Sequence, residues 1–259
     1  MTDAGLFKTT DAGANWTAVN AGLPQWRPLV SILEIDPQDT NTLYAVDPCC
    51  PNPFKSTNGG AYWTAVYDAA RGARLYARDL AIDPRNPRTL YAAGSFIQAG
   101  SGPEWGTGVF KSTNGGINWS GVSSGLPVST RDQSVLVTTL AIDPQNPGTI
   151  YAGIGRQGFQ ARGSGIFKTT NGGTSWSWLN SGLPNYVTAL AIDPQNPSTI
   201  YAGSGSGVFR STDGGANWNA VNSGLTTLSV STLAIDRQNP GTVYAGAADG
   251  GVFAITFVP

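Results

Sequence analysis

Histidine is absent from the 259 residues of this chain, and that absence excludes more chemistry than any other feature of its composition. Without an imidazole there is no Ser-His-Asp or Cys-His nucleophile and no histidine ligand for zinc. Cysteine is nearly as scarce, because the adjacent Cys49 and Cys50 are the only two. This pair forms either a strained disulfide or two thiols at a rigid loop tip. The sequence therefore predicts no metal site and no cofactor.

Charge is also sparse, at 12% of residues against a typical ~25%. Lys and Arg (15) almost balance Asp and Glu (16), and the net charge is −1. With no basic stripe, the sequence gives no reason to expect a nucleic-acid partner. It also lacks an apolar run of about 18 residues, so we expect no membrane-spanning helix. Residues 1–4 lead directly into an expected strand, and we expect no signal peptide within this chain.

Repetition is what the sequence has in abundance. Residues 190–225 contain four short apolar runs separated by Asp-Pro and Gly-rich turns, which predicts four antiparallel strands. The first strand of this unit, Leu-(Ala/Glu)-Ile-Asp, occurs five times, at 33–36, 80–83, 140–143, 190–193 and 233–236. A tyrosine in the second strand follows the Asp by eight residues every time, at positions 44, 91, 151, 201 and 244. The sequence thus predicts five equivalent units.

The hairpin between the third and fourth strands carries the most regular motif. Its five copies are KTTDAGANW (8–16), KSTNGGAYW (55–63), KSTNGGINW (111–119), KTTNGGTSW (168–176) and RSTDGGANW (210–218). We expect the Asp or Asn to accept a hydrogen bond from the backbone two residues further on, as in an Asx-turn. Glycine at 13, 60, 116, 173 and 215 then allows the positive φ of a tight turn, and the tryptophan is predicted to be a core residue.

The pattern (Ser/Thr)-x-(Asp/Asn)-x-Gly-x-x-Trp resembles the Asp-box, or BNR, repeat of sialidases, sortilin-type receptors, family 74 xyloglucanases and a photosystem II assembly factor. Five motifs in register over residues 5 to 246 recur at, or somewhat above, the ~40–50-residue period of propeller blades. The resemblance implies an all-β fold: a five-bladed β-propeller of four-stranded antiparallel blades, with residues 1–259 as a single domain. It also favours an extracellular or periplasmic protein, as do the low charge and the Ser, Thr and Gly content.

Variation between the units is confined to one end of each sheet. The connections from second to third strand and from fourth to first strand differ in length, whereas the other turns are constant. Loops of this kind usually hold the function of a repetitive scaffold. Arginine and aromatic side chains are abundant there and suit a glycan or an anionic group. We predict a ligand site that draws on Arg78, Asp79, Tyr76, Trp105, Arg131, Arg156, Trp26 and Tyr186.

Arg78 and Asp79 depart most clearly from the repeat. Alignment of the first strands places Arg78 against Ser31, Thr138, Thr188 and Ser231, and Asp79 against Ile32, Thr139, Ala189 and Thr232. Two charged residues among small ones indicate either a ligand contact near the mouth of the propeller channel or a local salt bridge.

These observations favour a non-catalytic binding or scaffold propeller. One alternative is a small glycoside hydrolase of the sialidase type, which needs two facing carboxyl groups. The sequence offers Asp47, Asp79, Glu104 and Asp132 for that pair. Arg78, Arg131 and Arg156 with Tyr76 or Tyr186 imitate a sialidase site, but the N-terminal arginine motif of sialidases is missing. The other alternative is a structural module that associates with itself.

The ends of the chain contain one third strand too many, because residues 5–9 and 251–255 both match it. We predict that the N- and C-terminal strands close the ring, with the hairpin at 5–20 beside the strand at 242–245. Residues 251–258 would then be left over, packed in the closing blade of their own chain. The alternatives are that this tail displaces residues 5–9 or links two copies through a sheet edge.

Overall fold

The computed structural model describes residues 5–24, 30–47, 50–66, 74–97, 106–127, 134–157, 165–179, 182–183 and 186–257, and for residues 97, 134, 135, 156 and 157 it describes the backbone alone. The regular elements in these ranges are all β-strands, so the described part of the chain contains no helix able to span a membrane. Turns that contain Pro and Asn follow the strands that end at residues 35, 82, 142 and 192, as the sequence predicts.

Four sheets have the predicted four strands each, and in every sheet each strand pairs antiparallel with the next one along the chain. They are β3 (Ile32–Ile35), β4 (Leu43–Val46), β5 (Phe54–Ser56) and β6 (Thr64–Ala65); β7 (Arg74–Ile82), β8 (Leu90–Ile97), β9 (Gly106–Ser112) and β10 (Ser120–Gly121); β11 (Ser134–Ile142), β12 (Ile150–Gln157), β13 (Gly165–Thr169) and β14 (Ser177–Leu179); and β15 (Val187–Ile192), β16 (Ile200–Ser204), β17 (Gly207–Ser211) and β18 (Asn219–Ala220). With the sheet of β19 to β21 as the fifth blade, the predicted all-β, five-bladed β-propeller is confirmed.

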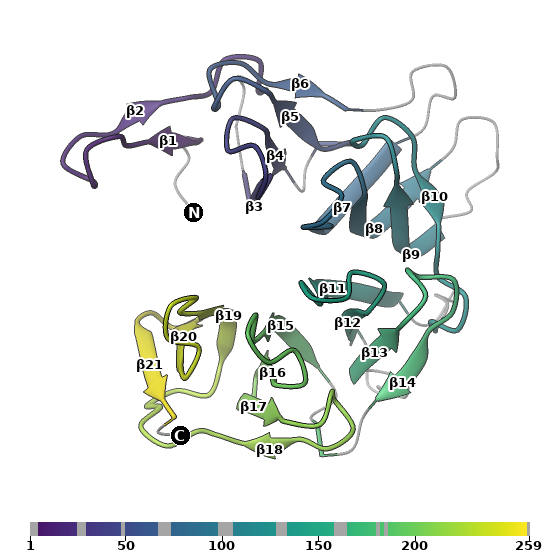
Figure 1. The fold of residues 1–259 in the computed structure, drawn as a ribbon, viewed down its shortest axis with the longest axis vertical. Coiled ribbons are helices and arrows are strands. Elements are labelled where there is room, and N and C mark those ends of the chain that lie inside the picture. The colour runs from purple at the N-terminus through teal and green to yellow at the C-terminus, as the bar shows by residue number, and fades with distance from the viewer. Residues whose placement is uncertain are drawn as a thin grey trace. The chain divides into compact units, whose positions relative to one another are not determined.

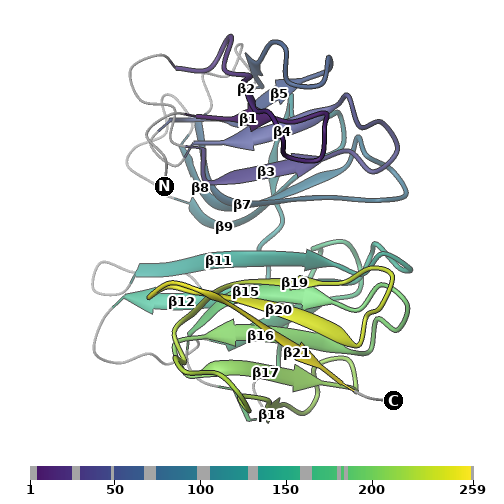
Figure 2. The ribbon, with the colours of Figure 1, turned by 90° about the vertical axis from the view of Figure 1, so that its left-hand side faces the viewer.

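The fifth blade has three strands, β19 (Val230–Ile235), β20 (Thr242–Ala247) and β21 (Val252–Thr256). Strand β21 is antiparallel to β20 over five residue pairs, from Thr242 with Thr256 to Gly246 with Val252. Figure 2 shows these two strands in the last sheet. The prediction that the hairpin at 5–20 takes this place is therefore wrong. The tail has the advantage of a short connection, because the entropic cost of loop closure rises with the number of residues between two strands. The prediction that the tail packs in the last blade of its own chain is confirmed.

The N-terminal hairpin consists of β1 (Phe7–Lys8) and β2 (Thr17–Ala18), which form a two-stranded sheet of their own (Figure 1). Only two residue pairs join these strands, Phe7 with Ala18 and Lys8 with Thr17. The backbone N–H of Val19 adds a hydrogen bond to the Leu6 carbonyl at 2.9 Å. An isolated two-stranded hairpin of this length has little stability of its own.

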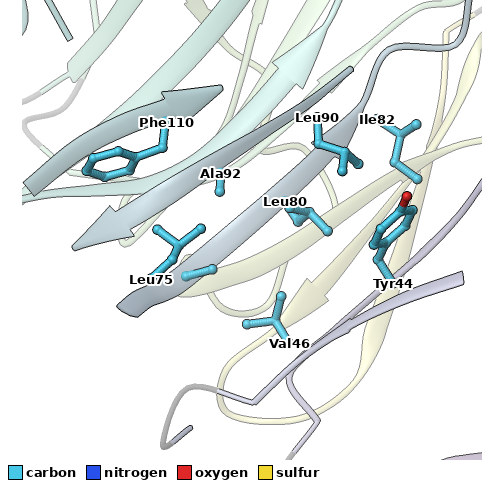
Figure 3. Close-up of a cluster of buried hydrophobic side chains, with 9 residues drawn as sticks. Tyr44, Val46, Leu75, Leu80, Ile82, Leu90, Ala92 and Phe110 are labelled. Carbon is cyan, nitrogen blue, oxygen red and sulfur yellow. The ribbon is translucent and has the colours of Figure 1, made fainter. Parts of the chain in front are cut away.

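The chain divides into two compact units, one of residues 1–106 with 110–121 and the other of residues 107–109 with 122–259. In the first unit the core lies between neighbouring sheets, where Tyr44 and Val46 of β4 meet Leu75, Leu80 and Ile82 of β7 (Figure 3). The second unit has two buried apolar clusters. Strand β16 contributes Ile200 and Ala202 to one of them, and β20 contributes Val243 and Ala245 to the other. The core is thus built sheet against sheet, because one blade cannot bury both of its faces by itself.

The motif tryptophans do not share one environment. Trp63, Trp176 and Trp218 are buried, Trp119 is half-buried, and Trp16 of the N-terminal hairpin is 61% exposed. The prediction of a core residue is therefore confirmed at three positions, whereas Trp16 is not buried by its own unit. A large apolar ring becomes a core residue only where a neighbouring element covers it.

Candidate functional site

The structure describes five of the eight predicted ligand residues, and four of these five lie on strands. Trp26, Trp105 and Arg131 lie outside the described residues, as do Cys49, Glu104 and Asp132, and Arg156 is described by its backbone in β12 alone. The structure places Tyr76, Arg78 and Asp79 on β7 and Tyr186 directly before β15. We describe these positions unit by unit.

Arg78 occupies a β-bulge in the first unit. The register of β7 and β8 shifts between Ala77 and Asp79, so that Arg78 has no direct partner on β8. The same shift occurs in β11, β15 and β19, and it bypasses Thr138, Thr188 and Ser231. The sequence alignment of Arg78 with these residues is therefore confirmed as a shared bulge position. Bulges redirect a side chain and are frequent beside binding sites.

In the second unit small hydroxyl side chains at the bulge connect neighbouring sheets. The Thr138 hydroxyl donates to the Val187 carbonyl oxygen (2.6 Å) and lies 3.0 Å from that of Gly153, and the Thr188 hydroxyl donates to the Val230 carbonyl oxygen (2.6 Å). At the same position Arg78 is exposed. A guanidinium replaces a short hydroxyl there, so Arg78 adds charge to the surface of its unit at a position where the repeat needs none.

Asp79 and Tyr76 lie close to Arg78 on the same strand. Both are half-buried, and the Asp79 carboxylate accepts a hydrogen bond from the Leu80 backbone N–H at 2.8 Å. Tyr76 pairs with Ser95 of β8. The structure thus brings together three of the predicted residues, one basic, one acidic and one aromatic, on one segment of β7.

In the second unit Tyr186 forms a separate aromatic surface. Its ring lies against Gly155 of β12, where any side chain would overlap the ring carbons. Gly155 directly precedes Arg156 in the same strand. The Tyr186 ring nevertheless remains 44% exposed. An aromatic ring that rests on backbone and is partly exposed resembles the platforms on which apolar faces of sugars or planar groups stack.

The motif turns at the opposite end are self-contained. The Asn58 side-chain oxygen accepts from the Tyr62 N–H at 2.9 Å, and the Ser56 hydroxyl accepts from the Gly60 N–H at 3.0 Å. The prediction that the Asn side chain accepts from the backbone two residues further on is therefore wrong, because it accepts from the N–H four residues further on. The predicted positive φ of Gly13, Gly60, Gly116, Gly173 and Gly215 is confirmed, at 89–93°.

Where the motif has Asp in place of Asn, these hydrogen bonds lower the pKa of the Asp carboxyl. The Asp213 carboxylate accepts from the Asn217 side chain (2.8 Å), the Asn217 N–H (2.9 Å) and the Ser211 hydroxyl (2.8 Å). They lower the pKa of Asp213 to about 2, and the Asn217 side chain contributes most. Hydrogen bonds to a carboxylate favour its charged form. Asp11 has the same arrangement with Asn15 and a pKa of about 2.

We expect Asn217→Ala to raise the pKa of Asp213 from about 2 towards its ordinary value of 3.8, because the largest of the three contributions is removed. A lowered pKa in the folded state means that stability is present above the unfolded pKa and is lost as the pH falls through about 2. In the variant the folded pKa lies closer to the unfolded value, so this contribution to stability is smaller and its loss is complete at a higher pH. The measurement is an NMR titration of the Asp213 carboxyl, with the exposed Asn219→Ala in β18 as control. An unchanged midpoint in Asn217→Ala would contradict the assignment.

Sequence reasoning missed a side-chain link between neighbouring turns. The Gln38 amide donates to the carbonyl oxygens of Pro84 (3.0 Å) and Arg85 (3.2 Å) in the first unit. The Gln145 amide makes the same pair of bonds to Pro194 and Gln195 in the second unit. The sequence did contain a signal for this link, because Asp-Pro-Gln occurs at both positions. This end of the sheets is thus occupied with structural contacts.

Among the described residues there is no group of three or more Cys, Asp or Glu side chains that could hold a metal ion. Of the four carboxylates considered for glycoside hydrolysis, the structure describes two, Asp47 and Asp79. Asp47 is 2% exposed, so its carboxylate is not presented to solvent, and Asp79 is half-buried.

Comparison with known proteins supports the fold. No protein-family model and no curated protein matches the chain. Solved structures do match: an ancestral GH74 enzyme (25% identity, TM-score 0.57, over 87% of this chain and 27% of that chain), the GH74 xyloglucanase from Xanthomonas campestris (17%, 0.53, 98% and 49%) and YCF48 from Cyanidioschyzon merolae (16%, 0.55, 89% and 68%).

This chain spans between about a quarter and a half of the length of the GH74 enzymes that it resembles. The GH74 enzymes and YCF48 are differently named proteins, and all of them share the propeller fold with this chain. The likeness is therefore evidence of architecture, and activity has to be argued from the site itself.

Proposed function

We propose that this protein is a non-catalytic binding or scaffold propeller of the Asp-box type, whose ligand is a glycan or an anionic group held at the variable end of its sheets. The observation that supports it best is the exposed Tyr186 ring on Gly155, directly beside Arg156 in sequence. Stacking on an aromatic ring together with bidentate arginine hydrogen bonds is the usual chemistry of sugar and carboxylate recognition. In the first unit, exposed Arg78 with Tyr76 and Asp79 offers a second set of the same residue types.

The opposite end of the sheets is a poor alternative. Its motif turns and Gln38 and Gln145 are already engaged in hydrogen bonds within the chain. A ligand there would have to compete with those bonds. The proposal also includes export, since glycan recognition is largely extracellular and the composition is low in charge.

We expect Tyr186→Ala to weaken glycan binding by roughly tenfold, the equivalent of the ~1.4 kcal/mol that an aromatic stacking contact can supply. The measurement is a glycan array followed by titration of its best hit. Arg78→Ala tests the first unit in the same assay. The matched control is Tyr62→Ala, because Tyr62 is also an exposed tyrosine but lies in a motif turn at the opposite end.

Two outcomes would contradict this assignment. Binding that is unchanged in both Tyr186→Ala and Arg78→Ala would place the ligand elsewhere. An array without any signal would favour a scaffold without a glycan ligand.

We further expect no turnover of fluorogenic β-glucosides or sialosides. Of the four candidate carboxylates, the two that the structure describes are the half-buried Asp79 and the buried Asp47, and a glycosidase needs two that face one substrate. Turnover that disappears in Asp79→Asn or Asp132→Asn would overturn the non-catalytic assignment and favour the small glycoside hydrolase instead.

A further inference from the structure

Three of the five motif turns contain the dipeptide Asn-Gly, at Asn58, Asn114 and Asn171. The turn favours glycine after the Asn, because the three glycines have φ of 65–73°. Asn-Gly is chemically labile, since no Cβ shields the glycine nitrogen from the side chain of the preceding Asn.

The reaction of this dipeptide is deamidation. The glycine backbone nitrogen attacks the Asn Cγ, a bond forms between these two atoms, and the bond from Cγ to Nδ2 breaks. The Nδ2 amide leaves as ammonia and takes the proton of the glycine nitrogen with it. Water then opens the cyclic imide to Asp, or to isoaspartate when the other carbonyl is attacked. The net change consumes water and releases ammonia, without an oxidant or a cofactor.

The closed turn holds both reacting groups of Asn114 in place. Its side-chain oxygen accepts from the Asn118 N–H at 2.9 Å and from the Ser112 hydroxyl at 3.0 Å. The Gly115 N–H donates to the Arg88 carbonyl at 2.8 Å. An amide proton that is bound to a carbonyl resists transfer during the attack. The reaction therefore requires the hairpin to open locally, away from the turn that contains Arg88.

The glycines of the other two Asn-Gly turns are held in the same way. The Gly59 N–H donates to the Asn41 carbonyl at 2.9 Å, and the Gly172 N–H donates to the Gly148 carbonyl at 2.9 Å. The three turns differ instead in how firmly the tryptophan that follows each of them is fixed.

Trp63, which follows the turn of Asn58, is fixed at two points. The segment Val19–Leu23 after β2 covers it in the first unit, and we call this the covering segment. The Trp63 backbone N–H donates to the Ala21 carbonyl at 2.8 Å, and its indole N–H donates to the Val19 carbonyl at 2.8 Å. With its ring 1% exposed, Trp63 opposes the opening of its hairpin.

Trp119, which follows the turn of Asn114, lacks one of these anchors. In the second unit the indole N–H of the buried Trp176 donates to the Val122 carbonyl at 2.7 Å. The Trp119 indole N–H is buried and has no hydrogen-bond partner among the described residues, Val66 at the position of Val122 included. A buried donor without a partner costs free energy in the closed state, so this hairpin opens more easily.

The product of deamidation at this position has a precedent in the same chain. At Asp213 the carboxylate accepts from the Asn217 side-chain amide at 2.8 Å, in a turn that begins with Ser. The turn of Asn114 also begins with Ser and has Asn118 at the position of Asn217. Conversion of Asn114 to Asp thus gives the residue set of the Asp213 turn, in which a charge-assisted hydrogen bond stabilises the new carboxylate.

The other two turns do not offer this hydrogen bond. Tyr62 stands four residues after Asn58, and Ser175 stands four residues after Asn171, so neither turn has a side-chain amide there. Isoaspartate fits none of the three turns, because it adds a methylene group to the backbone that the hydrogen bonds of the turn span.

We propose that Asn114 is a deamidation site of this protein, and that its conversion to Asp turns its motif into one like that of residues 211–218. The reaction takes place while the β9–β10 hairpin is open, and the closed turn then retains Asp through Asn118. Each conversion adds one negative charge to a chain whose net charge is −1. This inference is independent of the proposed ligand site.

The first test compares the three Asn-Gly sites in one sample. Wild-type protein is incubated in mildly alkaline buffer, folded or in urea, and both products are quantified by peptide mapping with mass spectrometry. In urea we expect similar rates at the three sites, because the dipeptide is the same. In the folded protein we expect Asn114 to react roughly tenfold faster than Asn58 and Asn171, which corresponds to ~1.4 kcal/mol in the free energy of opening.

Two results of this test would overturn the proposal. One is a folded protein in which the three sites react equally or another site reacts fastest. The other is a folded protein in which Asn114 stays intact for as long as the urea sample takes to convert completely.

The second test installs the product directly. We expect Asn114→Asp to have a melting temperature at or above that of the wild type at neutral pH, and Asn118→Ala to lower it more in the Asn114→Asp variant than in the wild type. Asn58→Asp is the matched control without an amide four residues on, and it should be the less stable of the two Asp variants. If Asn114→Asp proves no better tolerated than Asn58→Asp, or if Asn118→Ala costs the same in both backgrounds, the turn does not retain the product and the proposal fails.

Discussion

Trp63→Ala is expected to lower the free energy of unfolding by about 3–5 kcal/mol, the range for removal of a buried aromatic side chain. Trp63 is 1% exposed and packs against Leu23, Ala45 and Phe54. The substitution also leaves the Val19 carbonyl without the indole N–H that it accepts at 2.8 Å. Urea denaturation followed by circular dichroism measures the change.

The same substitution in the same motif at Trp16 is the control. Because Trp16 is exposed within its unit, Trp16→Ala should change the free energy of unfolding by no more than about 0.5 kcal/mol. The comparison removes residue type and motif as variables and leaves the covering segment as the difference. Equal losses at the two positions would show that the motif turn itself needs the indole.

Gly22→Ala is expected to destabilise the chain by about 4 kcal/mol or more, which is unusual for the addition of one methyl group. Two costs combine. Gly22 has φ +90°, a conformation that costs an L-residue roughly 1–2 kcal/mol. The added Cβ would also overlap the Trp63 carbonyl, and a backbone atom cannot move aside as a flexible side chain does. Thermal or urea denaturation of the purified variant provides the measurement.

Gly224→Ala separates these two costs. It has the same turn and nearly the same φ, but no atom lies within 4 Å of the position that its Cβ would take, so only the conformational cost of roughly 1–2 kcal/mol applies. If Gly22→Ala proves no more harmful than Gly224→Ala, the contact between Gly22 and Trp63 contributes little to stability.

The repeat pattern predicted the positions of the strands well, because strand and turn are decided by neighbouring residues. Leu-Ala-Ile-Asp followed by a Pro-Gln turn specifies a strand and its end wherever it occurs, and the motif glycines took the predicted positive φ. The shared position of Arg78 with Thr138 and Thr188 was also visible in the alignment, because a bulge recurs with the repeat.

The sequence predicted which types of residue form the candidate site better than it predicted how those residues are arranged. The sequence indicated Tyr186 as a ligand residue, but the contact of its ring with Gly155 needs a fold that brings two sheets of the second unit together. The hydroxyl links of Thr138 and Thr188 and the amide links of Gln38 and Gln145 have the same origin. Each joins residues more than 40 positions apart, which local propensity does not encode.

The sequence alone determined that this is an all-β repeat protein with five equivalent units and without histidine chemistry, because composition and local hydrogen bonding decide those properties. Only the tertiary structure decided which tryptophan is core and which strand completes the last sheet. Trp16 and Trp63 have the same motif, and residues 5–9 and 251–255 have the same pattern. Their different fates depend on the neighbour that covers Trp63 and on the short turn that brings β21 back to β20.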